Sequence, residues 1–210
     1  MRECFTVRAR KDFSNIAIST AMLQLSPNAI SLLVDGEWLS AVEYRERVAQ
    51  RVAECDVSIG VSFSAGAFAG LAAGIFSGVQ RMAVFSPIIS LSEEAAQIDE
   101  RVGALRDSIL RLGAPALRGA TNIADLIKAQ HYRGRIVVYY PRSRAVDAYH
   151  AKQLAGFPRV RLHPVDTNEH AFWMNVGTGR LLSRLTNLPI RKVRDGEAPS
   201  DDDEALTDAL

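Results

Sequence analysis

Two serines with small neighbours stand where this chain could carry a nucleophile. Ser62 and Ser64 lie in the stretch Gly60-Val61-Ser62-Phe63-Ser64-Ala65-Gly66, which follows a short apolar run and precedes an alanine-rich run without proline. This pattern predicts a tight turn from a strand into a helix. A serine on such a turn can present its hydroxyl, and the N–H of the following residue is free to hold an oxyanion. The chemistry that these residues favour is acyl transfer.

The turn resembles the nucleophile elbow of the α/β-hydrolase superfamily, which usually has the form Gly-x-Ser-x-Gly. With Ser64 as the nucleophile, Ser62 and Gly66 occupy the two small positions, and Ser62 replaces the first glycine. A register shifted by two would make Ser62 the nucleophile, flanked by Gly60 and Ser64. We favour Ser64, because only this register places a glycine and further small residues directly after it, where the family's helix packs on its sheet.

A serine hydroxyl needs a base to take its proton and a carboxylate to orient that base. In the superfamily the acid and the histidine follow the serine in this order, each on a loop after a later strand. The resemblance therefore implies Asp147, which follows a predicted strand at 135–140, as the acid. It implies His170, which follows a predicted strand at 159–163, as the general base.

Both positions have alternatives. Asp147 could instead cap the helix that is predicted to begin there, and Asp166, which is closer to His170 in sequence, is the second candidate for the acid. His163 is the second candidate for the base, although its place at the end of an alternating strand favours packing or solvation.

The oxyanion would take one N–H from Ala65 and another from the loop after a predicted strand at 16–20. Ala21 is the first candidate for this second donor, and Met22 is the next. The His-Gly pair that often ends this strand in the superfamily is replaced here by Ser19-Thr20.

The other polar residues predict neither a cofactor nor a metal. The four histidines have no metal-ligand spacing, and we expect His131 and His150 on helical surfaces without a role. No Walker-type phosphate loop is present. Cys4 and Cys55 are too few and too far apart for a disulfide framework, which favours a reducing compartment, and the first residues lack a signal-peptide core. We expect a cytoplasmic protein.

The uncharged stretch 57–80 supports a rival class, because small-residue faces pack helices together in membranes. Glycines recur in it every four residues, at Gly66, Gly70, Gly74 and Gly78. Its first third is β-branched, however, and no cluster of Lys or Arg follows it. We therefore expect no membrane span, and we interpret the glycines as letting the helix after the turn lie close on the sheet.

The composition is that of a soluble globular domain, with 48% hydrophobic and 23% charged residues among 210. The segment 195–210 carries seven acidic residues and no basic one, so it has a charge of −7 and the rest of the chain +8. We expect a disordered acidic tail at 195–210 and a single α/β-hydrolase-like domain over 1–194. The arginines are scattered without exposed aromatics between them, which predicts no binding of nucleic acid.

The elements that must position these side chains alternate between strand and helix, which predicts a three-layer α/β sandwich with a mainly parallel sheet. The segment 91–134 is either a lid or an ordinary crossover. Strands are expected at 15–20, 29–34, 56–61, 80–89, 135–140 and 159–163, and helices at 39–54, 65–76, 92–112, 122–130, 146–154 and 170–185.

These features predict a small serine hydrolase that cleaves a carboxylic ester, a thioester or an amide through an acyl-enzyme. The partner would be a small acyl substrate, and the sequence leaves the oligomeric state open. The alternatives are a noncatalytic binding protein on the same scaffold and, less favoured, a single-span membrane interaction protein.

Overall fold

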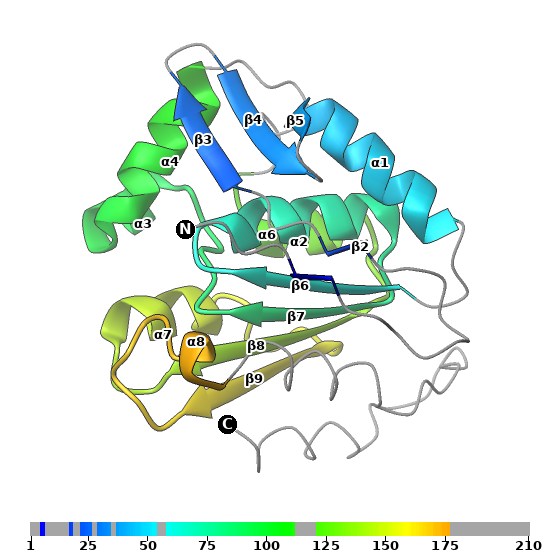
Figure 1. Cartoon of the computed structure of the whole chain (residues 1–210). Helices are drawn as coiled ribbons and strands as arrows, with labels where there is room; N and C mark the ends of the chain where they lie inside the picture. Colours follow the sequence, from blue (N-terminus) through cyan, green and yellow to red (C-terminus); the bar gives the residue numbers. More distant parts are fainter. Residues whose placement is uncertain are drawn as a thin grey trace.

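The centre of the fold is a parallel sheet of four strands in the order β6-β7-β8-β9 (Figure 1). Its strands are β6 (Ile59–Phe63), β7 (Arg81–Phe85), β8 (Arg135–Pro141) and β9 (Val160–Val165). The computed structural model of the chain describes residues 5–6, 17–18, 22–26, 29–34, 37–53, 58–111 and 121–176. Each strand is parallel to its neighbour, so all four carboxyl ends meet at one edge of the sheet.

Helices connect the strands of this sheet. They are α2 (Gly66–Ser77) after β6, then α3 (Glu93–Ile98), α4 (Glu100–Arg111) and α6 (Ile123–Ala129) between β7 and β8, and α7 (Ala145–Lys152) between β8 and β9. A short helix α8 (Trp173–Val176) follows β9. The predicted α/β fold with a parallel sheet is confirmed, and the arrangement is compatible with a three-layer sandwich.

The two faces of the sheet have different cores. On one face, aliphatic side chains of the strands pack against α2, α4, α6 and α7. On the other face, four aromatic rings in register cross the strands, with centroids 4.9 to 5.2 Å apart. These rings are Phe63, Phe85, Tyr139 and His163. Trp173 of α8 packs against Phe63, so the chain returns to the carboxyl edge of the sheet on this aromatic face.

Glycines let α2 lie directly on β6. A Cβ at Gly70 would come within 2.8 Å of the Ser62 Cβ, and one at Gly74 would overlap Met82. Gly78 ends the helix with a φ of 70°, in the left-handed region that glycine adopts at low cost. The packing role predicted for the glycines therefore holds at Gly70 and Gly74, whereas a Cβ at Gly66 would meet nothing within 4 Å.

The N-terminal strands do not join the parallel sheet, contrary to the prediction for 15–20 and 29–34. β1 (Phe5–Thr6) pairs with β2 (Ala17–Ile18), and β3 (Met22–Ser26), β4 (Ala29–Val34) and β5 (Glu37–Ser40) form a separate antiparallel sheet. Helix α1 (Ala41–Ala53) follows β5 and packs on α2. The pattern of apolar residues predicted the strand at 29–34 but not its antiparallel partners.

The segment between β7 and β8 is divided. Helix α6 belongs to the core through Ile123, Leu126 and Ile127, as a crossover helix would. The helix predicted over 92–112 is broken at Asp99, whose backbone is extended and whose side chain is buried. The break starts α4 in a new direction at the carboxyl edge of the sheet.

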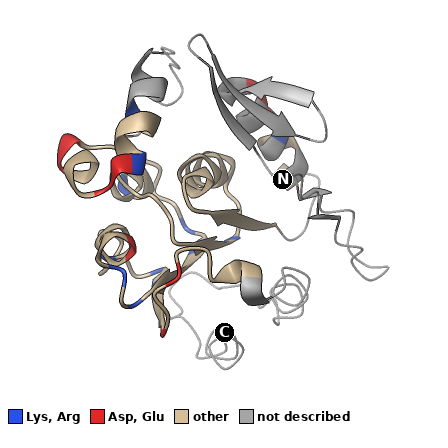
Figure 2. Ribbon diagram, turned by 60° about the vertical axis from the view of Figure 1, so that its left-hand side comes forward, with Lys and Arg blue, Asp and Glu red and all other residues tan. Residues whose placement is uncertain are grey.

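Two other predictions concern charge and membranes. The uncharged stretch 57–80 contains a strand and a helix, and no helix in the described ranges is long and apolar enough to cross a membrane. Figure 2 shows basic and acidic residues interspersed along the described ribbon. The acidic tail at 195–210 lies outside the described residues.

Candidate active site

Ser64 occupies the turn between β6 and α2 in a strained backbone conformation. Its φ is 49°, in the left-handed region that a non-glycine residue adopts at a cost of about 1–3 kcal/mol. Hydrogen bonds hold this conformation: the Ser64 N–H donates to the Phe85 carbonyl at 2.8 Å, and the Ser64 carbonyl accepts from Ala67 and Ile88. The strained turn directs the side chain away from the sheet at its carboxyl edge.

The two candidate serines face different surroundings. Ser62 is paired with Val84 within the sheet, and its side chain lies against Gly70 of α2. Ser64 instead places its Oγ 2.7 Å from Nε2 of His170. The structure thus brings Ser64 to the histidine and keeps Ser62 in the packing between strand and helix.

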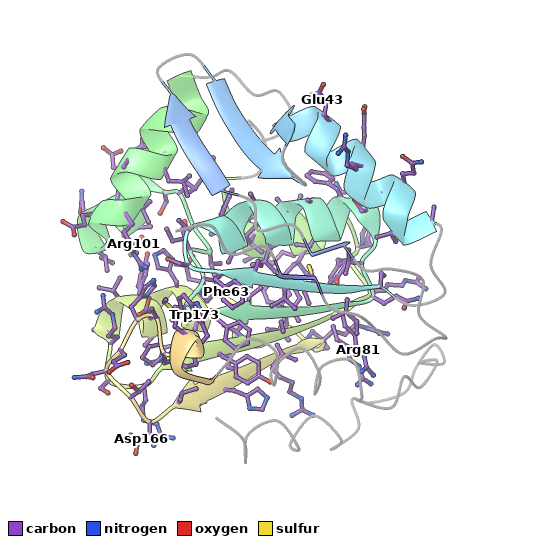
Figure 3. The ribbon with its side chains drawn as sticks, in the orientation of Figure 1. Glu43, Phe63, Arg81, Arg101, Asp166 and Trp173 are labelled. Carbon is purple, nitrogen blue, oxygen red and sulfur yellow. The ribbon has the colours of Figure 1, made fainter. Side chains whose placement is uncertain are left out.

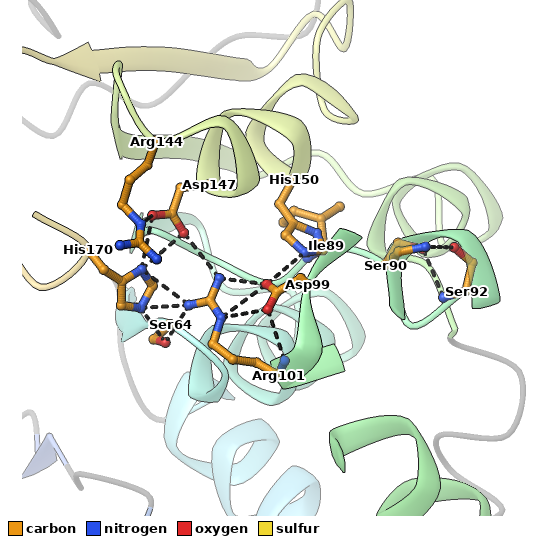
Figure 4. Close-up of polar contacts among 11 residues, drawn as sticks. Ser64, Ile89, Ser90, Ser92, Asp99, Arg101, Arg144, Asp147, His150 and His170 are labelled. Atoms are coloured by element: carbon orange, nitrogen blue, oxygen red, sulfur yellow. Dashed lines mark hydrogen bonds and ion pairs between the residues drawn. The ribbon is translucent and has the colours of Figure 1, made fainter. Parts of the chain in front are cut away.

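Asp147 completes a chain of three side chains (Figure 4). Nδ1 of His170 lies 3.0 Å from each carboxylate oxygen of Asp147. A carboxylate only accepts, so Nδ1 carries the hydrogen and Nε2 keeps its lone pair for Ser64. Asp147 comes from the first turn of α7, and His170 from the loop between β9 and α8.

The Asp147 carboxylate is fully buried and is held ionised by its partners. Burial would raise the pKa of this carboxyl, but the hydrogen bond to His170 and the nearby charge of Arg101 outweigh it and lower the pKa. Arg144 adds an ion pair, with its Nε 2.9 Å from Oδ2. Asp147 does not cap α7, because the capping position belongs to Arg144.

The other candidates lie elsewhere. Asp166 is exposed, and Figure 3 shows it at the bottom of the described ribbon, apart from Arg101. His163 is stacked on Tyr139 in the aromatic row. His131 is exposed in the turn after α6, but the expectation for His150 is wrong, because its side chain is fully buried.

Two residues outside the predicted set support His170. Ser86, at the end of β7, also has a positive φ of 43°, and its Oγ donates to the His170 carbonyl at 2.9 Å. Trp173 packs edge to face on the imidazole, with centroids 5.4 Å apart. The histidine is therefore fixed through its backbone by β7 and through its ring by α8.

Arg101 is the largest omission from the sequence prediction. This residue, on the first turn of α4, places its Nη1 2.7 Å from His170 Nε2 and 3.3 Å from Ser64 Oγ. No motif marks it, because the helical pattern of 92–112 runs on across Asp99. Only the break at Asp99 turns Arg101 toward the serine.

Asp99 and His150 form a second buried pair, and Asp99 holds Arg101. Its Nε and Nη2 donate to the Asp99 carboxylate at 2.6 to 3.0 Å, and Asp99 Oδ2 lies 3.3 Å from Nε2 of the buried His150. Burial lowers the pKa of His150, which also accepts a hydrogen bond at Nδ1 from the Ile89 N–H. One turn of α7 therefore separates Asp147, which orients His170, from His150, which supports Asp99.

Of the two predicted oxyanion donors, the Ala65 N–H is available and the other is not located among the described residues. Within the described ranges no hydrogen bond uses the N–H of Ala65, which directly follows the serine. Ala21 lies outside the described residues, and Met22 begins β3 in the antiparallel sheet. The predicted strand before Ala21 is not part of the parallel sheet among the described strands, so the position of a second backbone donor stays a prediction.

The described residues contain no group of three or more histidine, cysteine, aspartate or glutamate side chains arranged to hold a metal ion. Comparison of the sequence with protein-family models gives no match, and comparison with curated proteins gives none either.

Proposed function

We propose that this protein is a serine hydrolase that cleaves a carboxylic ester, or a thioester or amide, through an acyl-enzyme. The observation that carries the proposal is the continuous contact from Ser64 Oγ to His170 Nε2 at 2.7 Å and from His170 Nδ1 to Asp147 at 3.0 Å. The strained conformation of Ser64 and the unused N–H of Ala65 support it. These features agree with the resemblance to the α/β-hydrolase superfamily.

The reaction uses these side chains in two half-reactions. Ser64 Oγ forms a bond to the acyl carbon while its proton passes to His170 Nε2, and the carbonyl oxygen becomes an oxyanion beside the Ala65 N–H. The bond to the leaving oxygen then breaks, and that oxygen takes the proton from Nε2. A water molecule repeats the sequence on the acyl-enzyme and releases the acid, which restores Ser64.

Each residue has a distinct part in the reaction. Asp147 keeps the hydrogen on Nδ1 and stabilises the imidazolium that forms after proton transfer. An ester is the favoured substrate, because an alkoxide leaves more readily than an amine. A cytoplasmic location stays a prediction from cysteine usage.

Labelling with a fluorophosphonate probe tests the proposal. We expect the wild type to be labelled at Ser64, Ser64→Ala to lose the label and His170→Ala to react more slowly by orders of magnitude. Asp147→Asn should slow labelling by about 10⁴-fold, as the loss of the correct imidazole tautomer does in serine proteases. Ser62→Ala, His163→Ala and Asp166→Ala are the matched controls, because Ser62 lies against Gly70 of α2, His163 is stacked on Tyr139 and Asp166 is exposed.

The result also separates the proposal from its alternative. A folded wild type that takes no label under conditions that label known serine hydrolases would favour a noncatalytic binding protein. Label on Ser62 would keep the hydrolase but show that the nucleophile is the other serine.

A further inference from the structure

Arg101 stands on the side of Ser64 where a leaving group must be. In the proposed reaction the leaving oxygen receives its proton from His170 Nε2, so it must lie within hydrogen-bond distance of Nε2 and beside Ser64 Oγ. Nη1 of Arg101 meets both conditions, at 2.7 Å from Nε2 and 3.3 Å from Oγ (Figure 4). A leaving group whose oxygen reaches Nε2 therefore passes beside this nitrogen.

Arg101 lies over the base and leaves its lone pair to the nucleophile. With the hydrogen on Nδ1, the neutral imidazole has a single lone pair at Nε2, in the plane of the ring and directed away from Nδ1. Ser64 Oγ and Arg101 Nη1 both lie 2.7 Å from Nε2, but Nη1 also lies 3.2 Å from Nδ1. An atom on the lone pair would be much farther from Nδ1, so Nη1 lies over the face of the ring, where an entering acceptor can reach it.

The rest of the guanidinium is fixed while Nη1 is available. Nε and Nη2 donate to Asp99, and Nη2 also lies 3.2 Å from Asp147. Nη1 has no carboxylate partner among the described residues, and its contacts are with Ser64 and His170. The Arg101 side chain is 25% exposed, whereas Asp99 is 3% exposed. The buried Asp99 thus serves as a fixed anchor that holds Nη1 beside Ser64 and His170.

We propose that Arg101 determines specificity for the leaving group, favouring one that carries an anionic oxygen such as a carboxylate. Such a group gives Nη1 a charged acceptor beside Ser64, which Nη1 lacks among the described residues, whereas a neutral group gives it none. Asp99 and His150 act as positioning residues for Arg101. This inference rests on the proposed hydrolase function and adds the class of leaving group to it.

Two esters with the same acyl group test the inference: 4-acetoxybenzoate, whose leaving phenol carries a carboxylate, and its neutral amide 4-acetoxybenzamide. We expect the wild type to prefer the anionic ester in kcat/KM. Arg101→Met should lower this preference by between about tenfold and a hundredfold, the range that one charge-assisted hydrogen bond supplies.

Control variants exclude a general loss of structure. Arg106→Met removes a basic residue from the same helix α4. Among the described residues Arg106 does not contact Ser64, His170 or Asp147, so this variant should leave the preference unchanged. Arg101→Lys keeps one charged donor and should retain part of the preference, and it carries the test if Arg101→Met does not fold.

Two outcomes would overturn the inference while leaving the hydrolase intact. Arg101→Met could slow both esters equally, which would mean that Arg101 stabilises the transition state whatever the leaving group. It could also leave both kcat/KM values unchanged, which would mean that Arg101 does not contact the substrate. Failure of the hydrolase proposal is distinguishable, because then the wild type would take no fluorophosphonate label.

Discussion

Gly70 in α2 is where a single methyl group should disturb the elbow. A Cβ built at this position would lie 2.8 Å from Cβ and 2.9 Å from Oγ of Ser62, closer than side-chain atoms approach one another. These two Ser62 atoms cannot move far, because the side chain is short and its backbone is paired with Val84 between β6 and β7. Gly70→Ala can therefore be accommodated only if α2 moves away from the sheet.

Two opposing effects set the size of the change in stability. Alanine favours a helix over glycine by about 1 kcal/mol, and overpacking a well-packed site costs about 1–3 kcal/mol. We expect the overlap to dominate, so that the free energy of unfolding falls by about 0–2 kcal/mol. The movement of α2 should also shift Ser64 from His170 and slow fluorophosphonate labelling.

Gly103→Ala is the matched control for denaturant unfolding. Gly103 lies within α4, and a Cβ there would meet nothing within 4 Å, so this variant should gain about 0.5–1 kcal/mol. In a Ser62→Gly background the penalty of Gly70→Ala should shrink by about 1–3 kcal/mol, because the atoms in its way are gone. If Gly70→Ala stabilises the protein as Gly103→Ala does, the close approach of α2 and β6 is not a constraint and the reasoning fails.

The remaining predictions concern His150 and Ser86. Burial lowers the pKa of His150, although the charges of Asp99 and Asp147 oppose the shift. The contribution of neutral His150 to the free energy of unfolding is therefore fully present above its unfolded pKa of about 6.5. This contribution is lost as the pH falls toward the lower pKa of the folded state. Denaturant unfolding at pH 7.5 and 5.5 should show a smaller loss for His150→Asn than for the wild type, and an equal loss would contradict this. Ser86→Ala removes the donor to the His170 carbonyl, so it should cost about 0.5–1.5 kcal/mol in the same assay and slow labelling of Ser64; labelling at the wild-type rate would show that this bond does not position His170.

The order of the elements and the candidate residues on them could be predicted from the sequence, because both depend on local patterns of residues. Apolar runs bounded by turn residues predicted strands close to β6 and β8, and the alternation of apolar and polar residues predicted one close to β9. Since parallel strands end at one edge, the loops that carry Ser64, Asp147 and His170 were expected to meet there. The structure brings these three side chains together, and their catalytic role stays a proposal.

The N-terminal strands were mispredicted for a different reason. The apolar run at 29–34 indicates a buried strand equally well in a parallel and in an antiparallel sheet. Its partners β3 and β5 are the strands that flank it in the chain, and both pair with it antiparallel. The Asp35-Gly36 pair between β4 and β5 is a hairpin signal that the prediction did not use.

The surroundings of the serine were decided by tertiary structure alone. The helical periodicity of 92–112 does not show a break at Asp99, because an aspartate is acceptable within a helix and its buried partners lie elsewhere in the chain. Asp99 is extended where its carboxylate meets Arg101 and His150, and these contacts form only once α4 and α7 have packed at the edge of the sheet. Local sequence determined which residues could act as nucleophile, base and acid; the packing of distant segments determined that an arginine stands beside the nucleophile and the base.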